Sequence, residues 1–94
     1  MIIRIVKMTF KPESVDRFVG VFGEREHLIA AFEGCNGVEL LRDINNPNIF
    51  FTYSKWDTPE HLENYRVSEL FITTWAMVKP HFADKPEAWS VESI

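Results

Sequence analysis

The segment that most constrains the fold is a strand at residues 2–11 that is apolar on both of its faces. Side chains alternate along a strand, so this one presents two apolar sets. They are Ile2, Val6, Met8 and Phe10 on one face, and Ile3 and Ile5 on the other. Helices in a small two-layer protein cover only one face of a sheet. The second apolar face therefore predicts a further partner that covers the sheet.

Length and charge limit the remaining classes of protein. The chain has 94 residues, so we expect one domain over residues 1–94. Ten Lys and Arg residues against 14 Asp and Glu residues give a net charge of −4 without a basic cluster, which argues against nucleic-acid binding. No apolar run is long enough to span a membrane, and residues 1–7 are typical of a strand rather than a signal peptide. These features predict a cytoplasmic domain.

The first half of the chain predicts a helix followed by a hairpin. Pro12 begins a long helix expected over residues 13–32, and Gly34 ends it. Strands expected at residues 35–43 and 49–56 are joined by the turn-forming residues between them.

The second half predicts two helices and a last strand. Thr58 caps a short helix that runs to about Arg66, and Ser68 caps a second helix through about Lys79. Alternating apolar residues over residues 87–94 indicate the final strand.

The resulting order, β-α-β-β-α-α-β, is typical of the ferredoxin-like fold. This is an α+β arrangement with a split βαβ unit, in which helices cover one face of an antiparallel sheet. The simplest cover for the other face is a second copy of the chain. We therefore expect a homodimer formed through the sheet face, as in a dimeric α+β barrel.

Three stretches carry a family resemblance that extends over essentially the whole chain. They are Phe32–Cys35 after the long helix, Phe50–Leu62 from the third strand into the short helix, and Tyr65–Phe71 around the second cap. In these stretches the chain resembles the antibiotic biosynthesis monooxygenase family of dimeric α+β barrels. The resemblance implies a cavity between sheet and helices that holds a small aromatic molecule. In the oxygenase members, that molecule reacts with O2 without a metal, flavin or other cofactor.

The sequence departs from the family at several polar positions. Many members carry His where Tyr65 and Leu70 stand here. The haem-degrading branch uses an Asn on the first strand, a Trp at the position of Tyr65 and a His ligand at the position of Trp75. The absence of these residues argues against haem degradation.

Cofactor-independent oxygenation requires a base, donors that stabilise an oxyanion, and apolar walls that exclude water. His61, Tyr65 and His81 are the candidate catalytic residues. His81 has the intrinsic pKa of a general base and follows the last helix, near the expected cavity mouth. His61 and Tyr65 stand four residues apart on the short helix and can share a face. Each histidine also has a simpler interpretation, as a helix-terminal or surface residue.

Four aromatic residues are candidates for binding the substrate: Tyr53, Trp56, Phe71 and Trp75. Buried core packing is the alternative for the two tryptophans. We expect His27 to be solvated and Cys35 to be a small buried residue. The spacing of the three histidines predicts no metal site.

The residues and the resemblance together predict a monooxygenase that oxidises a phenolic or quinol-like compound. Two alternatives remain open. The first is a non-catalytic dimer that binds a small molecule or acts in a stress response, and the second is an isomerase of a small carbonyl compound. Consumption of O2 would indicate the monooxygenase, a bound ligand recovered unchanged would indicate the binding protein, and turnover without oxygen would indicate the isomerase.

Overall fold

Four strands pair into one antiparallel sheet in the computed structural model, which describes all of residues 1–94. The strands are β1 (Ile2–Thr9), β2 (Cys35–Arg42), β3 (Ile49–Trp56) and β4 (Glu87–Val91). Their spatial order is β2-β3-β1-β4, so the connection from β1 to β2 passes over β3. This topology confirms the predicted α+β, ferredoxin-like fold.

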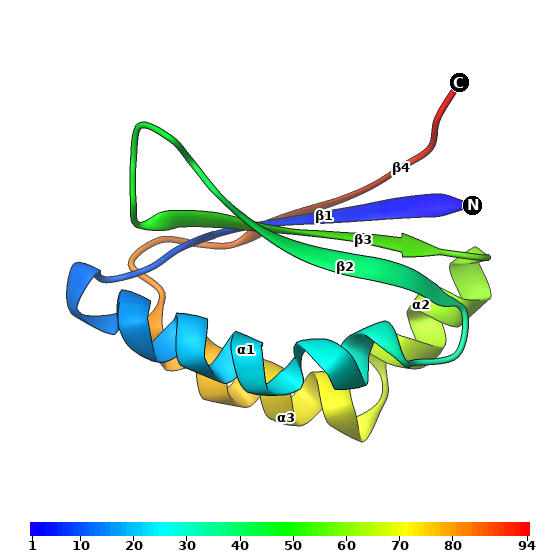
Figure 1. Ribbon diagram of the computed structural model, residues 1–94, viewed down its shortest axis with the longest axis horizontal. Helices are drawn as coiled ribbons and strands as arrows, with labels where there is room; N and C mark the ends of the chain where they lie inside the picture. The colour runs from blue at the N-terminus through cyan, green and yellow to red at the C-terminus, as the bar shows by residue number, and fades with distance from the viewer.

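Three helices lie together on one face of this sheet, and the other face is open (Figure 1). They are α1 (Val15–Ala30), α2 (Pro59–Arg66) and α3 (Glu69–Val78). The predicted caps are confirmed, because Thr58 Oγ1 accepts a hydrogen bond from the His61 amide at 3.2 Å and Ser68 Oγ accepts one from the Phe71 amide at 3.2 Å. Both α2 and α3 therefore begin where their sequence signals place them. None of the helices combines the length and the apolar character that crossing a bilayer requires.

Several predicted boundaries are wrong by a few residues. The first strand ends at Thr9 instead of residue 11, and Phe10 forms only an isolated bridge to Phe82. The helix expected over residues 13–32 starts as a 3-10 turn at Pro12–Ser14, and its α-helical part ends at Ala30, before Gly34 turns the chain with φ of 86°. The last strand ends at Val91 instead of residue 94. β4 pairs only with β1, whose own pairing begins at Ile2, so little of β1 remains for residues beyond Val91 to pair with.

A phenylalanine cluster holds the centre of the sheet against α1. Phe10 stacks on Phe18 with ring centroids 4.1 Å apart, and Phe50 meets both rings edge-on, at 5.9 and 5.3 Å. The buried core is completed by Met8, Val21, Phe22, Ile29 and Val78. Burial of these apolar side chains is the main stabilising contribution to the two layers.

Strand register divides the sheet residues into two faces, here called the inner face (toward the helices) and the outer face. Residues opposite each other in an antiparallel pair point to the same side. The inner face takes Arg4, Val6 and Met8 of β1 with Ser54, Thr52 and Phe50 of β3. The outer face takes Ile3 and Ile5 with their neighbours Lys55, Tyr53, Val91 and Trp89. The two apolar faces predicted for the first strand are confirmed.

Candidate active-site cavity

A cavity of about 350 Å³ lies between the inner face and the helices. Its size falls within the range of small-molecule sites in proteins. Most of the lining residues are apolar, and each of the four strands and three α-helices contributes at least one residue to the lining. The lining includes Val6 and Met8 of β1, Phe18, Phe22 and Ile29 of α1, Val38 of β2, Leu62 and Tyr65 of α2, Phe71, Trp75 and Val78 of α3, and residues 86–88 before and within β4. The polar members are Arg4, Thr52, Ser54, Arg66, Thr74 and Glu87.

Tyr65 is the only tyrosine that lines the cavity, and aromatic rings pack against it on several sides. Its ring stacks on Trp56 at 4.9 Å and meets Phe32 and Phe71 edge-on, at 5.4 and 5.3 Å. Burial, followed by the nearby Cys35 thiol, raises the pKa of Tyr65 to about 12. The phenol therefore stays protonated near neutral pH, where it can donate a hydrogen bond.

The Tyr65 hydroxyl is free to bind a ligand. It makes no hydrogen bond within the protein, yet the structure contains no fully buried side-chain polar atom without a partner. The hydroxyl must therefore be accessible. A phenol held rigidly by rings and lacking a protein partner is a ready donor for a bound molecule.

The cavity wall on α3 is also aromatic. Phe71 and Trp75, both predicted to bind substrate, line the cavity, and their rings stack at 5.8 Å with planes 11° apart. Thr74 lies beside them, but its hydroxyl is already committed: it donates to the Leu70 carbonyl and accepts from Arg25. The α3 wall therefore offers a flat apolar surface and few unpaired hydrogen-bonding groups.

Trp56, also predicted to bind substrate, is fully buried against the Tyr65 ring and does not line the cavity. Its Nε1 donates to Ser54 Oγ at 3.0 Å, and Ser54 does line the cavity. Trp56 thus supports Tyr65 by stacking and orients Ser54 by a hydrogen bond. The hydroxyl proton of Ser54 remains available to a ligand.

His61 is held in the cap of α2 and does not line the cavity. Its Nδ1 lies 2.7 Å from Thr58 Oγ1, the same atom that accepts from its amide. Its ring packs closely over Gly34, where a Cβ atom would collide with it. The structure therefore does not bring His61 and Tyr65 together at the cavity.

His81 lies in the 3-10 turn at Lys79–His81 and is likewise absent from the cavity lining. Its Nδ1 is 2.9 Å from Ser14 Oγ, in the turn that precedes α1. This contact ties the end of the α3 segment to the start of α1. Sequence reasoning expected His81 at the cavity mouth, and the structure places its polar contact in the helix layer instead.

Tyr53 lies on the outer face, across the sheet from the cavity. It pairs with Ile5 in register, and the Lys55 ammonium lies 5.9 Å from its ring centroid. A separate, smaller hollow of about 190 Å³ borders Tyr53, Lys55 and the bulged start of β2. Tyr53 therefore cannot reach a molecule bound beside Tyr65 in the same chain.

Arg4 and Arg66 are cavity residues that sequence reasoning missed. A signal for Arg4 was present, because it stands between Ile2 and Val6 in the alternating set that forms the inner face. Nothing in the sequence places Arg66 opposite it, since this depends on how α2 packs on the sheet. No group of three or more His, Cys, Asp or Glu side chains is arranged to hold a metal ion.

The fold and the cavity define a class of protein. It is an α+β domain with a ferredoxin-like antiparallel sheet and, beneath its helices, an aromatic-walled cavity of the size that small-molecule sites have. The sequence matches the family model for antibiotic biosynthesis monooxygenases over residues 1–76. The chain therefore belongs to the antibiotic biosynthesis monooxygenase family, as its resemblance indicated.

Solved structures agree with this assignment at the level of fold. A Nitrosomonas europaea protein, provisionally named an antibiotic biosynthesis monooxygenase, superposes with a TM-score of 0.92 at 15% identity, covering 100% of this chain and 99% of its own. A conserved Methanosarcina mazei protein gives 0.92 at 21% identity, with 100% and 94% covered. A Bordetella bronchiseptica protein, provisionally named for the same activity, gives 0.88 at 23% identity, with 99% and 96% covered. No curated protein sequence matches the chain. Identities this low show a shared fold.

Proposed function

We propose that the protein is a cofactor-independent monooxygenase that oxidises a phenolic or quinol-like compound with O2. Family membership supports the reaction class. The observation that carries the proposal is Tyr65, an unpaired and persistently protonated phenol in a mostly apolar, aromatic-walled cavity. Such a site binds a flat aromatic molecule, excludes water and donates a hydrogen bond to developing negative charge.

The proposed reaction needs no electrons from outside the substrate. The substrate loses a proton to solvent as it ionises to a phenolate or enolate, and this anion passes one electron to O2. The resulting radical and superoxide join to form a carbon–oxygen bond, and protonation gives a hydroperoxide. Loss of water then leaves a carbonyl, so that a CH2 unit and O2 become C=O and H2O. One oxygen atom stays in the product.

Tyr65 has a defined part in this scheme. Because its pKa is about 12, it acts as a hydrogen-bond donor to the substrate oxygen or the peroxide rather than as a base. Phe71 and Trp75 provide the flat surface against which the ring lies. Trp56 acts as a positioning residue behind Tyr65. Neither His61 nor His81 is given a step, since neither lines the cavity.

A matched pair of tyrosine variants tests the proposal. O2 consumption is followed with a panel of phenols, quinols and anthrones, and product mass is measured under isotopically labelled O2. Tyr65→Phe removes the cavity hydroxyl and should lower kcat about 100-fold, the usual cost of losing one oxyanion donor. Tyr53→Phe removes the outer-face hydroxyl and should change kcat less than about twofold.

The outcome also decides among the alternatives. Labelled oxygen in the product, lost in Tyr65→Phe but kept in Tyr53→Phe, supports the oxygenase. Turnover that continues under nitrogen would identify an isomerase instead. The lack of any cavity residue with a histidine side chain favours a second candidate, a binding protein without catalysis. A panel compound that binds and is recovered unchanged would support that candidate.

We also propose that two copies of the chain associate through the outer face. Trp89 and Val91 are 43% and 40% exposed there, beside Ile3 and Ile5, which are only partly buried. Apolar area of this kind is usually covered in a stable assembly. Light scattering should give twice the chain mass, and Trp89→Glu should give the single-chain mass. A single-chain mass for the unaltered protein would overturn this proposal.

A further inference from the structure

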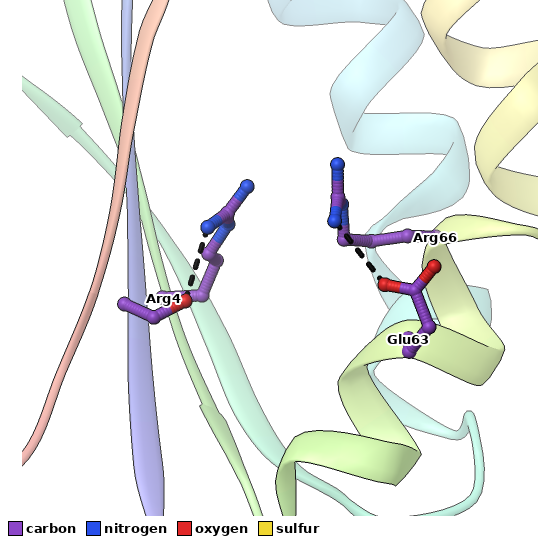
Figure 2. A network of polar contacts seen from close by, with 4 residues as sticks. Arg4, Glu63 and Arg66 are labelled. Atoms are coloured by element: carbon purple, nitrogen blue, oxygen red, sulfur yellow. Dashed lines mark hydrogen bonds and ion pairs between the residues drawn. The ribbon is translucent and has the colours of Figure 1, made fainter.

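Two arginines from opposite walls of the cavity point into the same space. Arg4 comes from β1 and Arg66 from the last turn of α2, and both line the cavity. Figure 2 shows the two guanidinium groups directed toward one another across the gap between the sheet and α2. Like charges that converge in this way are unfavourable unless an anion lies between them.

The protein itself does not supply enough negative charge for the pair. Glu63 Oε2 binds Arg66 Nη1 at 3.2 Å, and this is the one ion pair in the structure. Arg4 has only a neutral partner, since its Nη1 donates to Ser90 Oγ at 3.0 Å. Burial, and then the charge of Arg66, lower the pKa of Arg4, while Glu63 opposes this effect. Two positive groups thus share one carboxylate.

Glu87 is the only acidic residue in the cavity lining, and its position in the sheet directs it elsewhere. It lies opposite Lys7 in the β1–β4 register. Lys7 alternates with Val6 and Met8, so its side chain belongs to the outer face, and the side chain opposite follows it. Glu87 therefore does not neutralise the arginine pair.

The free donors of the pair match a planar oxyanion. A guanidinium carries five N–H donors in a fixed fork that suits a carboxylate, and Arg4 uses one of them within the protein. The same cavity also has an aromatic surface, formed by Tyr65, Phe71 and Trp75. A ligand that satisfies both parts carries a carboxylate on an aromatic body.

We propose that the cavity binds aromatic carboxylates, with the carboxylate between Arg4 and Arg66 and the ring against the α3 wall. This inference rests on the proposed function, since it names the substrate class of the same site. A cavity of about 150 Å³ holds one benzene ring. The volume of about 350 Å³ found here therefore suits a two-ring compound, and naphthalene-2-carboxylate is the probe.

Isothermal titration calorimetry with two probes of the same shape tests the charge requirement. Naphthalene-2-carboxylate should bind the unaltered protein at least about tenfold more tightly than naphthalene-2-carboxamide, because only the former is an anion. Raising the salt concentration should weaken binding of the carboxylate and leave that of the carboxamide nearly unchanged. Equal affinities, or no binding of the carboxylate, would overturn the proposal.

Three variants assign the effect to the arginine pair. Arg4→Gln and Arg66→Gln should each weaken binding of the carboxylate about 10- to 100-fold and that of the carboxamide less than about twofold. Arg17→Gln removes the same charge from an exposed position on α1 outside the cavity and should change neither affinity. Loss of carboxylate binding in Arg17→Gln, or its survival in both cavity variants, would contradict the assignment. Circular dichroism confirms that each variant is folded.

Glu63→Gln provides a test with the opposite sign. Glu63 competes with the ligand for Arg66, so its neutralisation should tighten binding of the carboxylate by up to about fivefold. A variant that merely disturbed the fold would weaken binding instead. Weaker binding in folded Glu63→Gln would count against the arrangement proposed.

The design separates failure of this inference from failure of the oxygenase proposal. If arginine-dependent binding of naphthalene-2-carboxylate is found without O2 consumption by any panel compound, the anion site stands and the oxygenase does not. If neutral phenols consume O2 while the two probes bind equally, the oxygenase stands and the anion site does not.

Discussion

The two faces of the sheet are built from the same strands, but helices cover only the inner one (Figure 1). On the inner face, alternate residues pack against α1 and α3 or line a cavity that contains the charged pair Arg4 and Arg66. On the outer face, the residues between them form a partly apolar surface that no helix covers (Figure 1). A shift of the strand register by one residue would move each inner-face side chain to the outer face and the reverse.

The inner face departs from its apolar pattern at one position of β1, where Arg4 stands. The inner-face row of β1 would be apolar throughout if Arg4 were apolar, because Val6, Met8 and Phe10 follow it in the same set. A charged side chain in that row costs stability. Such a local departure from the apolar pattern is typical of a functional site.

The largest effect should separate two tryptophans on opposite faces. Trp56 is 0% exposed on the inner face, and Trp89 is 43% exposed on the outer face. Trp56→Ala should lower the free energy of unfolding by about 3–5 kcal/mol, through lost burial and the cavity that remains. Trp89→Ala should cost less than about 1 kcal/mol in a dissociated chain. Urea denaturation measures both.

Protein concentration sharpens this test. If the outer face joins two copies, the cost of Trp89→Ala should grow as the concentration rises, since folding is then coupled to association. Trp56→Ala should show no such additional dependence. A large, concentration-independent loss from Trp89→Ala would mean that the outer face stabilises the single chain itself.

An intermediate effect concerns the pH dependence of stability. The pKa of Tyr65 is about 12 in the folded chain, above its ordinary value near 10. The unfolded chain therefore loses this proton first, and stability that is present below pH 10 declines as pH rises toward 12. The loss should be roughly 2 kcal/mol. Tyr65→Phe should remove this part of the dependence, as measured by urea denaturation at each pH.

The smallest effect compares charges on the two faces of β1. Arg4→Met should raise the free energy of unfolding slightly, by less than about 0.5 kcal/mol, because burial and Arg66 disfavour the charge at this partly exposed position. Lys7→Met, on the outer face of the same strand, should lower it slightly, since Lys7 stands opposite Glu87. A loss in Arg4→Met as large as that in Lys7→Met would indicate that Arg4 is structural.

Most elements were predictable because their signals are local. The strand at Ile49–Trp56 and the helix at Pro59–Arg66 match their predictions, since a turn, a proline and a cap mark their ends. The start of α1 and the end of β4 were less predictable. One begins as a 3-10 turn, and the other ends where its partner strand leaves little to pair with.

The candidate site was predictable only in part. Tyr65, Phe71 and Trp75 line the cavity, whereas Trp56 supports it from behind and Tyr53 lies on the other face. Tyr53 directly precedes the inner-face residue Ser54 in the sequence, so residue type alone could not show which face Tyr53 lies on. The register of β3 against β1 decides that question.

The sequence by itself determined the order of elements, the two apolar faces of the first strand and the family. Periodicity, turn residues and caps act within a few residues of one another, so they can be interpreted without the fold. Only the tertiary structure decided that His81 turns to Ser14 and that Arg4 faces Arg66. These contacts join segments through the packing of helices on the sheet. Their geometry depends on the whole layer, because side chains of several elements share the space between them.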